Sequence, residues 1–164
     1  MTTGLGVEIV DGQVTSYEVI TELTPIADAI VQTKSGLMLL PTDISLAKGE
    51  TEIMSKVGNF YLLKEVLDPV KNDFEHILID CPPSLGLLTI NALSTADVVL
   101  IPVQCQFFAL KGLAALLETI QSVQKRLNPS LRILGVLPTM AEMNTLMSQD
   151  ILASLKKRFQ DIPV

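Results

Sequence analysis

The sequence predicts an α/β protein with a doubly wound, mainly parallel sheet and helices on both faces. Three apolar runs, at residues 77–79, 98–101 and 133–137, are typical of strands that are buried on both faces of a parallel sheet. Segments with apolar residues at helical spacing separate these runs, which indicates βαβ units. Hydrophobic residues make up 48% of the chain but aromatic residues only 4%, so we expect a core of aliphatic side chains.

Length, charge and cysteine content narrow the class of protein. The 164 residues correspond to about one domain, which we expect to span residues 1–164. A net charge of −6 argues against a large nucleic-acid surface, because phosphate binding needs clustered Lys and Arg. Cys81 and Cys105 are too few for a disulfide framework, and no apolar run approaches the ~20 residues of a membrane span. We therefore expect a soluble, cytoplasmic protein.

The N-terminal segment is predicted to alternate short helices with one strand. A capping box at residues 15–18 opens a helix to about residue 23, and Thr-Pro at 24–25 begins a second helix to about residue 32. We interpret residues 36–41, an apolar run between Gly and Pro, as the first buried strand. Helices are expected over 46–55 and 61–70, since apolar residues recur there at helical spacing.

The stretch 74–84 organises the prediction for the whole chain. Its apolar run ends at Asp80, and Pro82 and Pro83 then remove two backbone donors and force the chain out of the sheet. We interpret 74–80 as a buried strand with Asp80 at its carboxyl end, where open α/β sheets bind ligands. Ser84 is expected to cap a helix to about residue 93. The alternative, that Asp80 only forms a turn beside this cap, stays open at this point.

The C-terminal half repeats the strand and helix alternation. Strands are predicted over 97–103 and 131–137, with a long amphipathic helix over 110–127 between them. A last helix is expected over 143–159. His76 is the only histidine, which excludes a metal site built from several histidines.

The order of these motifs resembles the ParA/Soj family of partition ATPases, which are deviant Walker-type relatives of MinD. The resemblance rests on several stretches and covers essentially the whole chain, which corresponds to the middle of such a protein. The stretches are Ile79-Asp80-Cys81-Pro82-Pro83-Ser84 with its continuation to residue 93, Ile101-Pro102-Val103-Gln104-Cys105, residues 108–113, Gly135-Val136-Leu137-Pro138-Thr139-Met140, Leu40-Pro41, Leu46-Ala47 and the pair Glu50 and Glu52.

The resemblance implies a nucleotide site with Mg²⁺ and ATP as cofactors. Asp80 corresponds to the Walker B-type carboxylate, the catalytic residue that holds Mg²⁺ through a water molecule. Pro82 and Pro83 correspond to the loop that senses the γ-phosphate, and Gln104 is placed with the nucleotide-dependent dimer face. Such a site agrees with the preference of Mg²⁺ for hard oxygen ligands, retained waters and phosphate oxygens.

The sequence departs from the family pattern at several places. Family members carry a Lys-Gly-Gly-x-Gly-Lys-Thr-Thr phosphate loop, and here only residues 2–6 match the end of the segment that follows it. Gln106 stands where relatives often carry an acidic residue, and residues 58–60 stand where many carry Arg. We therefore expect a partial domain, a fragment or truncated product that lacks the phosphate loop and the C-terminal part.

The resemblance implies the core of an ATPase that acts in plasmid or chromosome partition. Dimerisation with itself or a full-length relative, a ParB-like partner protein and, for the parent protein, DNA are implied as partners. Because the phosphate loop is missing, we expect this chain alone to be deficient in ATP binding and hydrolysis, and its status as an enzyme stays open. The alternatives are a non-enzymatic module that pairs with a full-length relative, or a fragment of a MinD-like positioning ATPase.

Overall fold

A computed structural model describes residues 2–105, 109–142, 144–159 and 162–164. The chain divides into two compact units, residues 1–95 and 96–164, and each unit is described by itself. The expectation of one domain over the whole chain stays a prediction. Gln106 lies outside the described residues.

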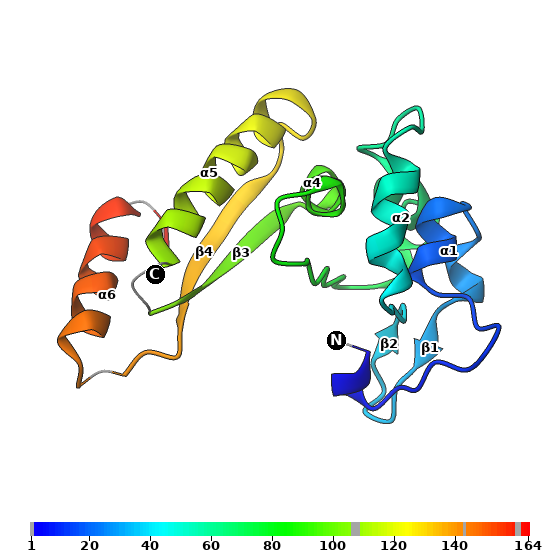
Figure 1. The fold of residues 1–164 in the computed structure, drawn as a ribbon, viewed down its shortest axis with the longest axis horizontal. Helices are drawn as coiled ribbons and strands as arrows, with labels where there is room; N and C mark the ends of the chain where they lie inside the picture. Colours follow the sequence, from blue (N-terminus) through cyan, green and yellow to red (C-terminus); the bar gives the residue numbers. More distant parts are fainter. Residues whose placement is uncertain (1, 106–108, 143, 160–161) are drawn as a thin grey trace. The chain divides into compact units, whose positions relative to one another are not determined.

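The first unit consists of helices and one small hairpin (Figure 1). Its strands β1 (Val31–Gln32) and β2 (Met38–Leu39) pair in antiparallel fashion. Three-residue 3₁₀ turns lie at Thr3–Leu5, Ile26–Asp28 and Lys71–Asp73. Its helices are α1 (Ser16–Thr21), α2 (Ser45–Ile53), α3 (Leu62–Leu67) and α4 (Leu87–Thr95).

The core of this unit forms where the four helices pack, with α1 contacting both α2 and α3, and α3 contacting α4. Aliphatic side chains fill it, as the composition predicts. Gly49 allows α1 and α2 to approach closely, since a Cβ there would lie 2.9 Å from side-chain carbons of Tyr17 and Thr21. The buried residues of the core are Val19, Ile20, Ile26, Ala29, Ile53, Leu62, Leu63, Val66, Leu67, Leu87 and Ala92.

The second unit is a parallel βαβ arrangement. Strands β3 (Val98–Gln104) and β4 (Arg132–Thr139) pair in parallel, with an irregularity between Val99 and Leu100. Helix α5 (Ala109–Arg126) connects them and packs on β3 (Figure 1). Helix α6 (Leu146–Arg158) follows, and the amide of Val136 in β4 donates to the Pro163 carbonyl at 2.9 Å. The parallel pairing and the crossover helix confirm the predicted α/β class.

The predicted strand at 74–80 is wrong. Residues 74–82 belong to no strand or helix, and no backbone hydrogen bond of residues 75–82 is found within the described part of the chain. Ile77 and Leu78, expected to be buried, are 41% and 89% exposed. The physical reason is that a strand needs a hydrogen-bonding neighbour, and no described segment pairs with this one.

Two other predictions in the first unit need correction. Residues 25–32 form only the turn Ile26–Asp28 followed by β1, because the chain reverses at Gly36, whose φ is +86°, and pairs with β2. The predicted strand over 36–41 shrinks to two residues, and Met38 is exposed. The helix after Ser84 begins only at Leu87, so Ser84 is not its cap.

Most helices and the two longer strands agree with the prediction. Thr15 caps α1 with both bonds of the predicted capping box present. Helices α2, α5 and α6 and strands β3 and β4 lie within a few residues of the predicted ranges. Apolar residues on one face of β3 and β4 are exposed, however, so these strands are buried on one face rather than on both.

Candidate functional site

Asp80 lies in the exposed stretch that precedes α4. Its side chain is exposed, and no hydrogen bond or ion pair of its carboxylate is found among the described residues. Both carboxylate oxygens therefore face water. A carboxylate in this state is available to a cation or to waters of a hydrated cation.

Pro82, Pro83 and Ser84 continue the chain from Asp80 towards α4 and are exposed. The three predicted residues Asp80, Pro82 and Pro83 therefore lie together in one loop of the first unit. The loop is fixed at its end, where the hydroxyl of Thr89 in α4 donates to the Ser84 carbonyl at 2.6 Å.

Gln104 is the last residue of β3, in the second unit, and its side chain is exposed. It lies opposite Thr139 at the carboxyl end of the parallel pair, the end at which α/β sheets bind ligands. An open hollow of about 290 Å³ lies beside it, between this end of β3 and α5. Its lining is mainly aliphatic and consists of Ile101, Pro102, Val103, Gln104, Gly112, Leu113 and Leu116.

The residues present fit a magnesium ion only in part. Asp80 offers the hard oxygen that Mg²⁺ prefers, and Mg²⁺ is often held by one or two carboxylates plus phosphate oxygens and waters. Within the described ranges, no group of three or more His, Cys, Asp or Glu side chains could hold a metal by itself. The sequence contains no Gly-Lys pair, so it offers no phosphate loop of the family type for the nucleotide.

The pKa of the Cys81 thiol depends on the environment of the Asp80 loop. Burial, and then the negative charge of Asp80, raise the pKa of Cys81 above its ordinary value. The thiol therefore stays protonated at neutral pH. Its alkylation rate consequently reports on the environment of the loop.

Two polar side chains that the residue pattern alone did not single out hold α4 in place. Asn91, 1% exposed, accepts a hydrogen bond from the Leu63 amide at 3.1 Å and donates to the carbonyls of Asn59 and Leu87 at 2.7 and 3.0 Å. Glu50 of α2 accepts from the Leu88 amide at 3.3 Å. A buried Asn inside an otherwise apolar helix was the available sequence signal for the first of these.

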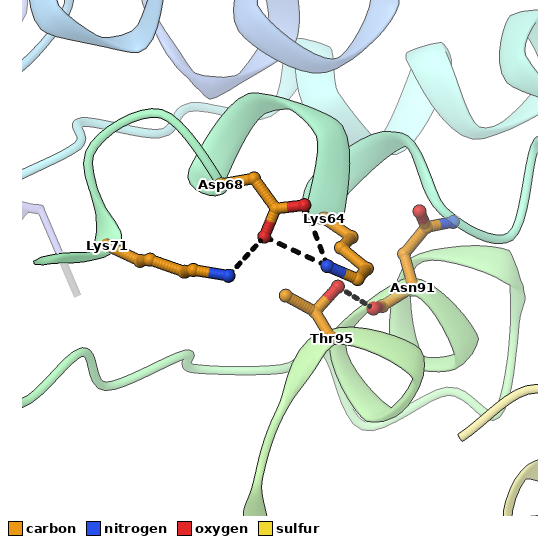
Figure 2. A network of polar contacts seen from close by, with 5 residues as sticks. All are labelled: Lys64, Asp68, Lys71, Asn91 and Thr95. Carbon is orange, nitrogen blue, oxygen red and sulfur yellow. Dashed lines mark hydrogen bonds and ion pairs between the residues drawn. The ribbon is translucent and has the colours of Figure 1, made fainter. Parts of the chain in front are cut away.

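Figure 2 shows Asn91 and Thr95 on α4 near a charged group formed by Lys64 of α3, Asp68 just after α3, and Lys71 in the following 3₁₀ turn. Asp68 accepts hydrogen bonds from Lys64 and Lys71 at 2.7–2.9 Å. The bonds from Lys64, and then from Lys71, lower the pKa of Asp68. All three side chains are substantially exposed, so this ion-pair group contributes little to stability.

No helix in the described part of the chain is both long and apolar enough to span a membrane.

Comparisons with known proteins agree with the motifs around Asp80. The model of an AAA domain family matches residues 1–133. The sporulation initiation inhibitor protein Soj of Bacillus subtilis is 43% identical over 161 residues, which is 98% of this chain and 64% of Soj. The chromosome partitioning protein ParA of Caulobacter vibrioides is 38% identical over 162 residues, 97% of this chain and 61% of ParA.

Solved structures have the same fold. A Mycobacterium smegmatis structure, described as cobyrinic acid a,c-diamide synthase with bound ATP analog and magnesium, matches with a TM-score of 0.91 and 39% identity. It covers 99% of this chain, and the match spans 66% of that protein. Apo McdA from Cyanothece matches with a TM-score of 0.89 and 27% identity over 98% of this chain and 66% of McdA.

The chain spans somewhat less than two thirds of the length of the curated relatives that it matches. The family match nevertheless covers most of the chain, and the matched solved structures share its fold over nearly its whole length. The exposed Asp80 loop and the parallel β3–β4 pair belong to the matched part. The chain is therefore a member of the ParA/Soj-type family of partition ATPases.

Proposed function

We propose that this chain is the core of an ATPase that acts in chromosome or plasmid partition, in the cytoplasm. The observation that carries the proposal is the Asp80-Cys81-Pro82-Pro83-Ser84 loop, whose carboxylate is exposed and uncommitted within the described structure. The name of the relative ParA, a chromosome partitioning protein, supports a role in partition. Mg²⁺ and ATP are the proposed cofactors, in line with the ATP analog and magnesium bound to the similar Mycobacterium smegmatis protein.

Asp80 is the proposed catalytic and metal-binding residue. Its carboxylate would hold Mg²⁺ through a water molecule, while Pro82 and Pro83 would border the γ-phosphate. Bound Mg²⁺ would supply charge neutralisation for phosphoryl transfer. The proposed contribution of Gln104 is to the nucleotide-dependent dimer face, where its exposed side chain at the end of β3 is accessible.

We further propose that the 164 residues alone bind ATP weakly and do not hydrolyse it. The reason is chemical: without a Gly-Lys phosphate loop, the backbone donors and the lysine that hold β- and γ-phosphates are missing from the sequence. Dimerisation, a ParB-like partner, and DNA binding that belongs to the parent protein and is weak in this chain complete the proposal.

A thermal-shift experiment with Mg·ATP tests this deficiency. A nucleotide present at about a hundred times its dissociation constant would add about 2.7 kcal/mol of stability, an easily measured shift. We expect no shift for this chain, and none for Asp80→Ala. A clear shift that disappears in Asp80→Ala would contradict the proposed deficiency and show that other residues cradle the phosphates.

A second candidate function is a non-enzymatic module that pairs with a full-length relative. Exposed apolar side chains at Ile77 and Leu78 favour it, because such groups often lie in protein contacts. Co-purification of the chain with a full-length ParA-family protein is expected under this function. A chain that stays monomeric in the presence of that protein would argue against it. A third possibility within the same family is that the chain is a fragment of a MinD-like positioning ATPase. No contact among the described residues favours this function.

A further inference from the structure

Helix α4 begins without a capping side chain of its own. Gly86 precedes its first residue, Leu87, and the Gly86 carbonyl accepts the hydrogen bond of the Ile90 amide at 3.1 Å. Gly86 therefore stands at the N-cap position but has no side chain. The first amides of a helix need acceptors from elsewhere, and an N-cap side chain normally serves the second or third of them.

Glu50 of α2 supplies the missing acceptor. Its Oε1 atom accepts from the amide of Leu88, the second residue of α4, at 3.3 Å. The carboxylate also fills the space that a side chain at position 86 would take, since a Cβ built on Gly86 would overlap Oε1 of Glu50. A negative charge at this end of a helix is further favoured by the helix dipole.

This contact fixes the end of the loop that carries Asp80. No backbone–backbone hydrogen bond of residues 75–82 is found within the described ranges; Ile79 packs against the core, and the hydrogen bonds that hold the loop lie at its α4 end. Two hydrogen bonds act there, the bond from Thr89 to the Ser84 carbonyl and the bond from Leu88 to Glu50. Of these two bonds, the one to Glu50 joins the loop end to a different helix.

We propose that Glu50 is a positioning residue for the Asp80–Ser84 loop. Its carboxylate caps α4 from α2 and thereby sets where the chain leaves the loop, so it acts on the loop through α4. The importance of this role for ATP chemistry rests on the proposed function. The contact between α2 and α4 is independent of the proposed function, because it is a hydrogen bond of the structure itself.

Glu52 provides a matched control on the same helix. It lies two residues after Glu50, carries the same charge, and accepts hydrogen bonds from the Tyr17 hydroxyl at 3.0 and 3.1 Å. It therefore ties α2 to α1 instead of α4. Loss of Glu52 should disturb α2 without releasing the Asp80 loop.

The alkylation rate of Cys81 by iodoacetamide at pH 8 measures the loop directly in the whole 164-residue chain. Cys105 is buried and serves as the internal reference. Cys81 is already exposed, so the gain expected in Glu50→Ala comes from freer movement of the loop, and the thiol should be alkylated severalfold faster. Glu50→Gln keeps an acceptor of the same size and should stay near the original rate, and Glu52→Ala should not change it.

Gly86→Ala tests the same contact from the other side, without altering Glu50. Its Cβ would displace the flexible end of Glu50, so this variant should fold with nearly unchanged urea stability but alkylate as fast as Glu50→Ala. In the double variant Glu50→Ala/Gly86→Ala the second change should add nothing, because the displaced group is already gone.

An unchanged Cys81 rate in both Glu50→Ala and Gly86→Ala overturns the proposal, as does an equal acceleration in Glu52→Ala. If Glu50→Ala fails to fold, Gly86→Ala and the Glu50→Gln comparison decide. These rates need no nucleotide. A failed Mg·ATP experiment therefore leaves the Glu50 result standing, and an unchanged Cys81 rate leaves the proposed function standing.

Discussion

The side chain of Asn91 makes three hydrogen bonds inside the first unit. Its buried amide joins α4 to the first turn of α3 and to the loop before it. In Asn91→Ala the Leu63 amide would be left buried without an acceptor, so we expect a loss of about 2–4 kcal/mol in the free energy of unfolding. Urea denaturation measures it. Asn59→Ala, which removes one exposed bond to the Met54 carbonyl, should cost less than about 1 kcal/mol and serves as control.

The charge of Asp80 can be measured at the neighbouring thiol. Because burial and then Asp80 raise the pKa of Cys81, Asp80→Asn should lower that pKa and increase the thiolate fraction at pH 8. The pH profile of Cys81 alkylation should therefore shift to lower pH in Asp80→Asn. Asp73→Asn, whose charge does not contribute to the shift, should leave the profile in place. An unshifted profile in Asp80→Asn would mean that the carboxylate points away from the thiol.

At the scale of the element, α1 shows how a local signal fixes a helix end. Burial opposes the ionisation of Glu18, but hydrogen bonds from the amide and hydroxyl of Thr15 outweigh it and lower the pKa of Glu18. A lowered pKa in the folded state means that the ionised group adds stability above its unfolded pKa of ~4.3. That stability is lost as the pH falls through the folded pKa.

The capping box therefore predicts a pH-dependent stability. Glu18→Gln should be less stable than the original chain at pH 7, and the difference should shrink as the pH falls below about 4. Thr15→Ala should cost about 1 kcal/mol at pH 7, since it removes the cap. Thermal unfolding between pH 3 and 7 measures both. A difference for Glu18→Gln that persists unchanged at pH 3 would assign its effect to packing instead of charge.

The same scale explains what the sequence could and could not predict. The capping box of α1 and the periodicity of α5 are contained within the segment itself, so these helices were predicted correctly. The strands β3 and β4 were predicted from their apolar runs, and the prediction is confirmed because each has the other as a parallel neighbour. Residues 74–80 have an equally apolar pattern, but a strand exists only with a neighbour, and the pattern of one segment does not contain that neighbour.

The candidate site also contains residues that the sequence predicted and a contact that only the structure shows. Asp80 was predicted from its position after an apolar run, whereas the site roles of Pro82, Pro83 and Gln104 came from the family resemblance, and all four assignments stay predictions. Glu50 was found only as part of a resemblance, and its role at α4 depends on a contact between residues 38 positions apart. No local pattern carries such a contact. Likewise, the sequence alone does not show that the missing side chain at Gly86 leaves room for the Glu50 carboxylate.

At the scale of the whole molecule, backbone protection should differ sharply between the β3–β4 pair and the stretch 75–82. Backbone amides of β3 and β4 donate hydrogen bonds within a parallel ladder. In contrast, no described residue accepts a hydrogen bond from the amides of residues 76–80. We therefore expect hydrogen exchange of the 76–80 amides near the unprotected rate and much slower exchange in the β3–β4 ladder. Comparable protection in both would show that residues 76–80 are paired as a strand after all.

Side-chain substitutions in the same two places give an independent check. Leu78 is 89% exposed, so Leu78→Ser should change the free energy of unfolding by less than about 0.5 kcal/mol. Ile101 of β3 is 2% exposed, and Ile101→Ala should cost about 2–5 kcal/mol because it removes buried methyl groups and leaves a cavity. Urea denaturation measures both. A large cost at Leu78 would mean that another surface covers it in solution, and size-exclusion chromatography of Leu78→Ser would then identify self-association through the loss of that contact.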